Sequence, residues 1–496
     1  MILPSWAAIF FLTVFSFLLP LHFGTRGFVF FDQSMIIDGA WRILLGQVPY
    51  RDFSVYFGPL LFYLQALFFK VFGMQLYSGV IHAAVMNMVA TLVTYWGMRR
   101  LMGASVISSL GGSLLTALWF YSPMSWPWFD ITGYLFLMIS LLLVWRGGKG
   151  SLFLSGFFCA LTWLCKANVA AVSSMVLPIV LYFFRRNLKK EFFYFITGYF
   201  FILFGWFTYL MVSHSLGSAW QDLVVRPNSL GRIHSLWHFP WGLVQQYPPV
   251  LTLLLVQALA FCFFFKDADV SRRKIYFSLM ILSLVSFVGA QTSSVDFHAH
   301  FVFVGWIWAG LSLGIFFSQD IRPSLKSFFV FLMWLILFLG GLRMSAERWP
   351  WQYGHIHPEG NLSTVHSPAF RHLWIQEPYA QDVDELLRWA QDELKEEDHF
   401  LVLPSMTLLY FVLKKEPPLP FVFLHERFSL QRKLHDEKRM MESLKKVSPK
   451  WLILETREQL PHLHELFEYF PTFYRLLQQQ YVPYKALSGY MILKHQ

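Results

Sequence analysis

The sequence predicts a polytopic α-helical membrane protein of about eleven transmembrane helices, followed by a small soluble α/β domain at the C-terminus. Composition supports the membrane part. Of the 496 residues, 56% are hydrophobic and only 14% are charged, and the mean hydropathy is +0.46. A soluble domain has about 25% charged residues, so a chain this apolar is expected in a bilayer. After about residue 344 the composition becomes that of a soluble protein.

The net charge of +10 does not indicate a nucleic-acid partner. The basic residues lie in short clusters at the ends of apolar runs, where they direct the topology of membrane proteins. The cysteines Cys159, Cys165 and Cys262 all lie inside apolar runs. We therefore expect neither a disulfide framework nor a cysteine-based zinc site.

Apolar runs along the chain set the number of spans. A helix rises about 1.5 Å per residue, so about 20 apolar residues cross a hydrocarbon core of about 30 Å. Residues 5–24 meet this length and lack the cleavage site of a secretory signal, so we expect a retained first span. The segment 151–184 also fits a re-entrant hairpin. The other predicted spans are residues 77–98, 103–121, 131–145, 151–167, 169–184, 192–213, 248–265, 276–293, 301–318 and 327–342.

Basic clusters predict which side of the membrane each loop occupies. If the spans alternate, these clusters all fall on one side, which the positive-inside rule makes cytoplasmic. The external side then holds residues 25–76, the short turn SPMSWPWFD, Lys166–Asn168, residues 214–247, the stretch QTSSVDFHAH and the chain after Arg343. We expect a protein of the cytoplasmic (inner) membrane with a transmembrane domain at 1–343 and an external α/β domain at 344–496. The clusters are Arg99–Arg100, Arg146 with Lys149, Arg185–Lys190, Arg272–Lys274, and Arg322 with Lys326.

Local periodicity predicts structure in both external parts. Apolar residues recur at helical spacing in SMIIDGAWRILLG and GPLLFYLQALFFKVFG, and glycine and proline separate the two runs. We expect two short helices along the membrane surface. In the C-terminal part, DVDELLRWAQDELKEE and SMTLLYFVLKK read as helices, and HFLVLP, KWLILE and YMILKHQ read as strands. This alternation favours a small α/β domain.

Ionisable residues at the boundary of apolar spans are candidates for function. Asp32 opens a predicted helix, where a carboxylate serves either the backbone amides or a reaction. Asp38 can pair with Arg42 at i,i+4, which favours a structural role. Asp52 beside Arg51 suits a turn residue and a functional residue equally well.

The later external segments add further candidates. Asp130 either caps the next span or takes part in chemistry, and Lys166 is either a snorkelling side chain or a cation for a lipid phosphate. Arg226 and Arg232 lie in the tryptophan-rich segment 214–247, which suits the membrane interface. Asp296, His298 and His300 follow one another at i,i+2 spacing, which does not place them on one helix face, so no metal site is predicted.

The run from Phe31 to Gly73 resembles the opening of membrane glycosyltransferases with the GT-C fold. This group contains the protein O-mannosyltransferases and the bacterial aminoarabinose transferase, and is related to glycosyltransferase family 39. Its members carry an acidic residue in the first external loop, then the pattern A..l..G..PY.D, a Gly-Pro pair and a span ending in lfG. The matching positions here are Asp32, Ala40, Gly46, Pro49, Tyr50, Asp52, Gly58, Pro59 and Gly73.

Two further stretches are similar to the same group. KANVA resembles a Lys-Pro-Asn element of bacterial members, with Ala167 in place of the proline, and TLLYFVLKKEPPLP resembles a segment of their external C-terminal domains. The chain departs from the group at Asp32-Gln33, where the mannosyltransferases carry Asp-Glu. A divalent metal bound by that pair is therefore not predicted.

The resemblance implies transfer of a sugar from a polyprenyl-phosphate donor to a glycan, lipid or protein acceptor at the external face. Such a transfer needs a base for the acceptor hydroxyl and cations for the phosphate leaving group. We assign Asp32 as the base, with Asp52 as a second catalytic carboxylate. No cofactor is expected besides the donor, and membrane lipids are the expected surroundings. The substrate-binding candidates are Lys166, Arg226, Arg232, Asp130, His298, His300 and Tyr50.

The sequence is also compatible with two other functions. A ligase that moves a preassembled polysaccharide from a lipid diphosphate would use arginines of segment 214–247 instead of a first-loop aspartate. A transporter or lipid flippase would carry charges at mid-membrane and often repeated halves. The sequence has neither feature, so a transporter is the less favoured alternative.

Overall fold

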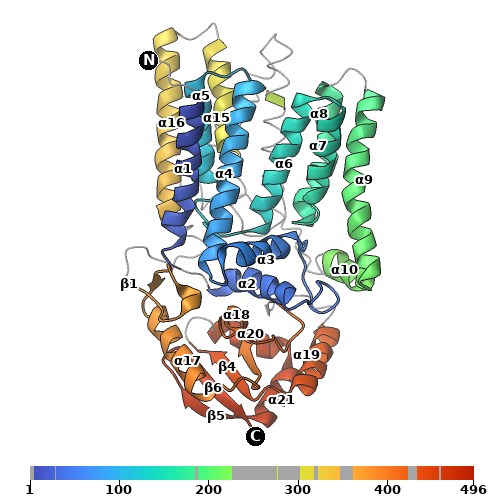
Figure 1. Ribbon diagram of the computed structural model, residues 1–496, viewed down its shortest axis with the longest axis vertical. Coiled ribbons are helices and arrows are strands. Elements are labelled where there is room, and N and C mark those ends of the chain that lie inside the picture. The colour runs from blue at the N-terminus through green and yellow to red at the C-terminus, as the bar shows by residue number, and fades with distance from the viewer. Residues whose placement is uncertain are drawn as a thin grey trace. The chain divides into compact units, whose positions relative to one another are not determined.

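The computed structural model describes residues 5–27, 30–184, 188–225, 276–277, 302–317, 322–346, 361–422, 433–456 and 460–496. The chain forms two compact units (Figure 1). The first unit comprises Met1–Gly24, Val80–Trp206 and Ile233–Gly354, and the second comprises Thr25–Gly79, Phe207–Arg232 and His355–Gln496.

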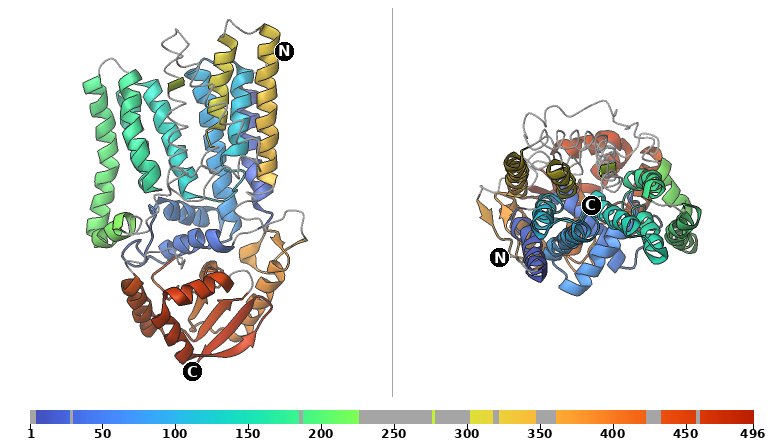
Figure 2. Two further views of the ribbon diagram at one scale, coloured as in Figure 1. Left: turned by 180° about the vertical axis from the view of Figure 1, so that it is seen from behind. Right: turned by 90° about the horizontal axis from the view of Figure 1, so that it is seen from above.

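The first unit is a bundle of apolar helices, seen end-on in Figure 2. Within the described residues, five helices are long and apolar enough to cross a membrane: α1, α4, α6, α9 and α16. Helices α5 and α15 have 14 residues each, α7 has 13 and α8 has 18. The bounds are α1 Ser5–Gly24, α4 Tyr77–Arg100, α5 Val106–Trp119, α6 Phe129–Arg146, α7 Lys149–Leu161, α8 Ala167–Phe184, α9 Leu188–Val212, α15 Val304–Phe317 and α16 Pro323–Ala346.

The predicted spans that fall on described residues each coincide with one of these helices, although their ends differ by a few residues. The predicted span at 248–265 lies outside the described residues, and so does that at 276–293 apart from residues 276–277. The count of about eleven spans therefore stays a prediction. Helix α7 has 13 residues, which is short for a span of about 20 residues.

Two contacts illustrate how the helices of the bundle are joined. The buried Asn87 amide on α4 donates to Ser16 O of α1 at 2.9 Å and to Ala117 O of α5 at 3.0 Å, so one polar group joins three helices. Helices α7 and α9 instead meet backbone to backbone. A Cβ at Gly156 would lie 1.8 Å from Phe195 O, so only glycine fits this crossing.

The second unit contains a four-stranded sheet in the order β3-β4-β6-β5. Strands β3 and β4 are parallel, and the other pairs are antiparallel. Strand β4 is almost entirely buried, as expected for a central strand, whereas β5 is exposed at the edge. The bounds are β3 Phe400–Leu403, β4 Trp451–Glu455, β5 Tyr481–Ala486 and β6 Tyr490–His495, with a separate pair of β1 Leu362–Ser363 and β2 Ile375–Gln376.

Helices pack around this sheet, and residues from α19, α20 and α21 form its core together with Leu401, Leu452 and Tyr481. Three of the strands and two of the helices lie where the sequence predicts them, while α19 to α21 and the edge strand β5 were not predicted. The helices are α17 Tyr379–Glu393, α18 Leu408–Val412, α19 Lys433–Val447, α20 Leu460–Tyr469 and α21 Pro471–Gln480.

The first predicted external segment belongs to this same unit. It forms α2 (Phe30–Leu44) and α3 (Leu60–Phe72), the two helices that the sequence predicts. Backbone hydrogen bonds join it to the C-terminal part, including Ser54 N–H to Pro420 O at 2.9 Å and Leu76 N–H to Ala369 O at 2.8 Å. Residues 33–40 of α2 are all buried. The predicted division placed residues 25–76 with the transmembrane domain, because periodicity alone does not reveal whether lipid or protein covers an apolar helix face.

Candidate functional site

The first unit holds an ion pair between Asp130 and Lys166. Asp130 lies in the first turn of α6, and Lys166 directly precedes α8. The Lys166 ammonium lies 2.7 Å from Oδ1 and 2.8 Å from Oδ2 of Asp130. The two side chains are 12% and 1% exposed, respectively, so Lys166 does not extend into solvent as a snorkelling side chain would.

The surroundings of this pair are buried on the Asp130 side and partly exposed on the Lys166 side. Every residue from 115 to 135 is buried, including the stretch SPMSWPWFD that the sequence suggested as a short external turn. Within it, the Tyr121 hydroxyl lies 2.6 Å from Thr132 Oγ1, which in turn donates to Trp128 O at 2.8 Å. Removal of either charge would leave the other one buried without an opposite charge, which strongly destabilises a folded protein. The pair is therefore a functional candidate rather than a surface contact.

The second unit holds a different buried pair, Asp38 with Arg42 on α2. The Arg42 Nε donates to Asp38 Oδ2 at 3.0 Å, which confirms the predicted i,i+4 pairing. Arg42 Nη2 also donates to Leu419 O at 2.9 Å and to Phe421 O at 3.2 Å. Burial raises the pKa of Asp38 to about 7, although Arg42 opposes the shift. These contacts join α2 to the C-terminal part of the unit and give the pair a structural role.

Asp52 is engaged in a turn. Arg51 donates to its two oxygens at 2.9 and 2.8 Å, and the Val48 N–H donates to Oδ2 at 2.7 Å. The hydrogen bonds from Arg51 lower the pKa of Asp52, so it is a weak base in this arrangement. The geometry favours the turn role, and a catalytic role for Asp52 stays a proposal.

Tyr50 belongs to a cluster of polar groups around α3. Its backbone is left-handed, with φ of 68°, and its buried hydroxyl donates to Phe57 O at 2.6 Å. Burial raises the pKa of Tyr50 well above its usual value, and the nearby Asp222 adds to this. Asp222 is itself buried and accepts the Val55 N–H at 3.2 Å.

Two tyrosines of the same cluster were missed by sequence reasoning. The hydroxyls of Tyr63 and Tyr209 lie 2.8 Å apart, and both raise the pKa of Tyr50. Tyr63 lies on α3 and Tyr209 on α9, and Asp222 lies in the π-helix Gln221–Val225, which follows α10 (Leu216–Trp220). No local motif links positions so far apart in the chain, so no signal in the sequence pointed to this grouping.

The remaining candidates are placed only in part. Asp32 is the third residue of α2, but the structure does not describe its side chain. Arg226, Arg232, His298 and His300 lie outside the described residues. Within the described ranges, no three His, Cys, Asp or Glu side chains are grouped as a metal site requires.

Comparison with solved structures identifies the fold. No family model and no curated protein matches this sequence. The chain has the GT-C fold of membrane glycosyltransferases, as the sequence resemblance implied. It is similar to ArnT from Cupriavidus metallidurans bound to undecaprenyl phosphate, with a TM-score of 0.59 and 13% identity over 98% of this chain and 97% of that chain.

It is also similar to the archaeal oligosaccharyltransferase AglB from Archaeoglobus fulgidus, solved with an inhibitory peptide and a dolichol-phosphate. There the TM-score is 0.55 and the identity 9%, over 98% of this chain and 74% of that chain. At such identities the likeness establishes the fold, and function must be argued from the site.

The buried Arg42 contacts generate a prediction about stability. We expect Arg42→Met to lower the free energy of unfolding by about 3–5 kcal/mol, because Asp38 then stays buried without its cation. Arg51→Met is the matched control, since the Arg51–Asp52 pair is solvent-exposed and its loss should change stability little. Thermal unfolding of the purified variants in detergent measures both. Equal melting temperatures for the two variants would contradict this role of Arg42.

Proposed function

We propose that the protein is a membrane glycosyltransferase, a hexosyl- or pentosyltransferase that uses a polyprenyl-phosphate-linked sugar as donor. The acceptor is a glycan, lipid or protein at the external face of the cytoplasmic membrane. The observation that carries this proposal is the likeness over nearly the full length of both chains to ArnT, which was solved with undecaprenyl phosphate bound. The first-loop pattern around Asp32 and Tyr50 supports it independently.

The proposed reaction needs a base and cations, and the candidate residues can supply both. The acceptor hydroxyl oxygen forms a bond to the anomeric carbon of the sugar, and the bond from that carbon to the phosphate oxygen breaks. Asp32 takes the hydroxyl proton, and cations stabilise the departing phosphate. Lys166 is one such cation, and the contacts of Asp130 would fix the position of its ammonium. Arg226 and Arg232 are proposed as further cations, and Asp52, Tyr50, His298 and His300 as further contacts to substrate.

The likeness to AglB favours one second candidate. AglB is an oligosaccharyltransferase, so the same fold also fits transfer of a preassembled glycan from a lipid-linked donor. The two proposals differ in the residues they need. Transfer of a single sugar needs a base in the first loop, whereas transfer of a preassembled glycan would depend on arginines of segment 214–247. Mass spectrometry of surface glycans from a deletion strain separates them: loss of a single sugar supports the first, and loss of a whole polymer supports the second.

Asp32→Asn tests the proposed base. Asparagine has nearly the same size and caps a helix about as well as aspartate, so the variant should express and melt like the wild type. It should nevertheless fail to restore the missing sugar in the deletion strain, since an amide does not accept the hydroxyl proton. Restoration to the wild-type level would remove Asp32 from the catalytic role.

A double variant tests whether the Asp130–Lys166 pair has a role in transfer besides its structural role. Lys166→Met alone leaves Asp130 buried without its cation, so it should lose both stability and activity. The double variant Asp130→Asn with Lys166→Met carries no uncompensated charge and should regain most of the lost stability. If Lys166 binds the donor phosphate, the double variant should still transfer about tenfold or more slowly than the wild type. A double variant with wild-type stability and wild-type transfer would show that the pair is only structural.

Sidedness is tested by cysteine labelling in a variant that lacks Cys159, Cys165 and Cys262. Lys438 on α19 exposes 76% of its side chain and suits a reporter cysteine. Lys438→Cys should react with an impermeant maleimide in intact cells or spheroplasts, because we propose that the C-terminal α/β domain is external. Lys149→Cys, in a predicted cytoplasmic cluster, is the control and should react only after lysis. The opposite pattern would contradict the proposed topology.

A further inference from the structure

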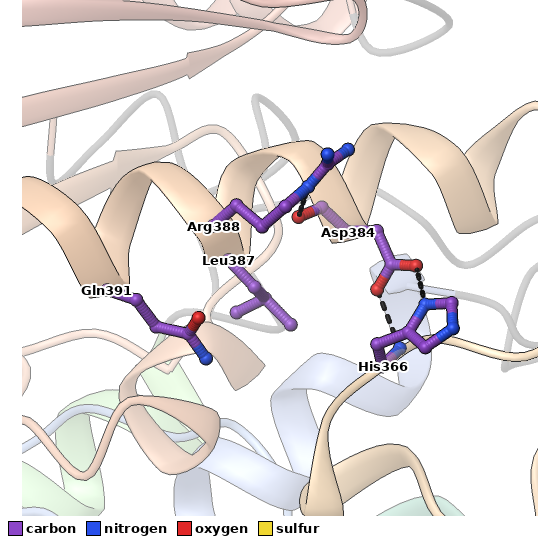
Figure 3. A pocket seen from close by; sticks show the side chains of 5 residues that line it. All are labelled: His366, Asp384, Leu387, Arg388 and Gln391. Carbon is purple, nitrogen blue, oxygen red and sulfur yellow. Dashed lines mark hydrogen bonds and ion pairs between the residues drawn. The ribbon is translucent and has the colours of Figure 1, made fainter.

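The C-terminal part of the second unit has a surface cavity that none of the proposed catalytic residues lines. Its volume is about 250 Å³, and it lies beside α17, against the loop that contains His366 (Figure 3). The lining residues are His366, Asp384, Leu387, Arg388 and Gln391.

Asp384 holds His366 in a defined orientation. One carboxylate oxygen accepts the backbone N–H of His366 at 2.7 Å, and the other lies 2.6 Å from its Nδ1. A carboxylate only accepts hydrogen bonds, so Nδ1 is the protonated nitrogen and Nε2 is left for a ligand. The His366 side chain is 87% exposed, so a ligand in solution can reach it. His366 is thus held to Asp384 through both its backbone N–H and its Nδ1, although its side chain is exposed.

Arg388 supplies a cation on the other side of Asp384 (Figure 3). Its Nε donates to Asp384 O at 3.3 Å, which orients the guanidinium. Within the described part of the chain, no hydrogen bond uses its two terminal nitrogens. The neighbouring acid Glu385 accepts the Ser488 N–H at 2.9 Å and is thus held toward another segment. A guanidinium presents paired donors that match a carboxylate or phosphate.

We propose that this cavity binds a saccharide through a carboxylate or phosphate group. Arg388 contacts the oxyanion, His366 Nε2 accepts a hydrogen bond from a sugar hydroxyl, the Gln391 amide donates to and accepts from other hydroxyls, and Leu387 provides an apolar surface for the sugar ring. Sites that enclose a whole small molecule measure about 300–1,000 Å³, so a smaller cavity suits one sugar unit. The proposal does not depend on the proposed transferase activity.

Calorimetric titration of the full-length protein in detergent tests the chemistry of the ligand. The probes are glucuronate, glucose 6-phosphate, glucose and inorganic phosphate. At least one of the two anionic sugars should bind with a Kd of about 1 mM or tighter. The stronger of these two identifies the group as carboxylate or phosphate. Glucose and inorganic phosphate should each bind about tenfold or more weakly, because each lacks half of the contacts.

Arg388→Gln locates the site and should weaken binding of the preferred anionic sugar by about tenfold or more. Arg475→Gln is the matched control. Arg475 lies on α21, and its Nε donates to Pro471 O at 3.4 Å, the same contact to the fourth preceding residue that Arg388 makes. Its replacement should leave binding unchanged. The proposal is overturned if neither anionic sugar binds, if glucose binds equally well, or if Arg388→Gln binds like the wild type.

Discussion

The Arg42 guanidinium is the contact on which the second unit depends. It bonds Asp38 within α2 and two carbonyl groups, Leu419 O and Phe421 O, nearly 380 residues later in the chain. A buried guanidinium is tolerated only with partners for its donors, so this arrangement holds α2 to the C-terminal part of the unit. Asp32 lies ten residues before Arg42, nearly three turns earlier on the same helix. The backbone that carries the proposed base is thus positioned by residues of the α/β part.

The same physical rule governs the Asp130–Lys166 pair in the first unit. Asp130 is buried and Lys166 is only 12% exposed, and each charge compensates the other. The pair joins the beginning of α6 to the residue before α8, so a structural role and the proposed role in phosphate binding would use the same atoms. This arrangement would favour catalysis at the proposed phosphate site. The Lys166 ammonium is already held by the Asp130 carboxylate, so it need not move when charge develops on the leaving group.

The GT-C fold and the residues of the two units support the transferase proposal in different ways. The fold relates the whole chain to ArnT and AglB, whereas a fold by itself does not define a reaction. Named side chains must do that, and those we propose include Asp32 in the first loop, Lys166 and Tyr50. The His366 cavity adds a separate place for sugar recognition on the second unit. Recognition and transfer need not use the same residues.

The sequence by itself determined the helices of the bundle, three of the four main strands and the Asp38–Arg42 pair. These follow from local patterns: long apolar runs for the bundle helices, short apolar runs for the strands and i,i+4 spacing for the ion pair. It also identified the GT-C fold through the first-loop pattern. Only the tertiary structure decided that residues 25–79 pack with residues 361–496, that Lys166 pairs with Asp130, and that Tyr50, Tyr63, Tyr209 and Asp222 gather. Periodicity shows that a helix face is apolar but not what covers it, and partners far apart in sequence meet only when the chain folds.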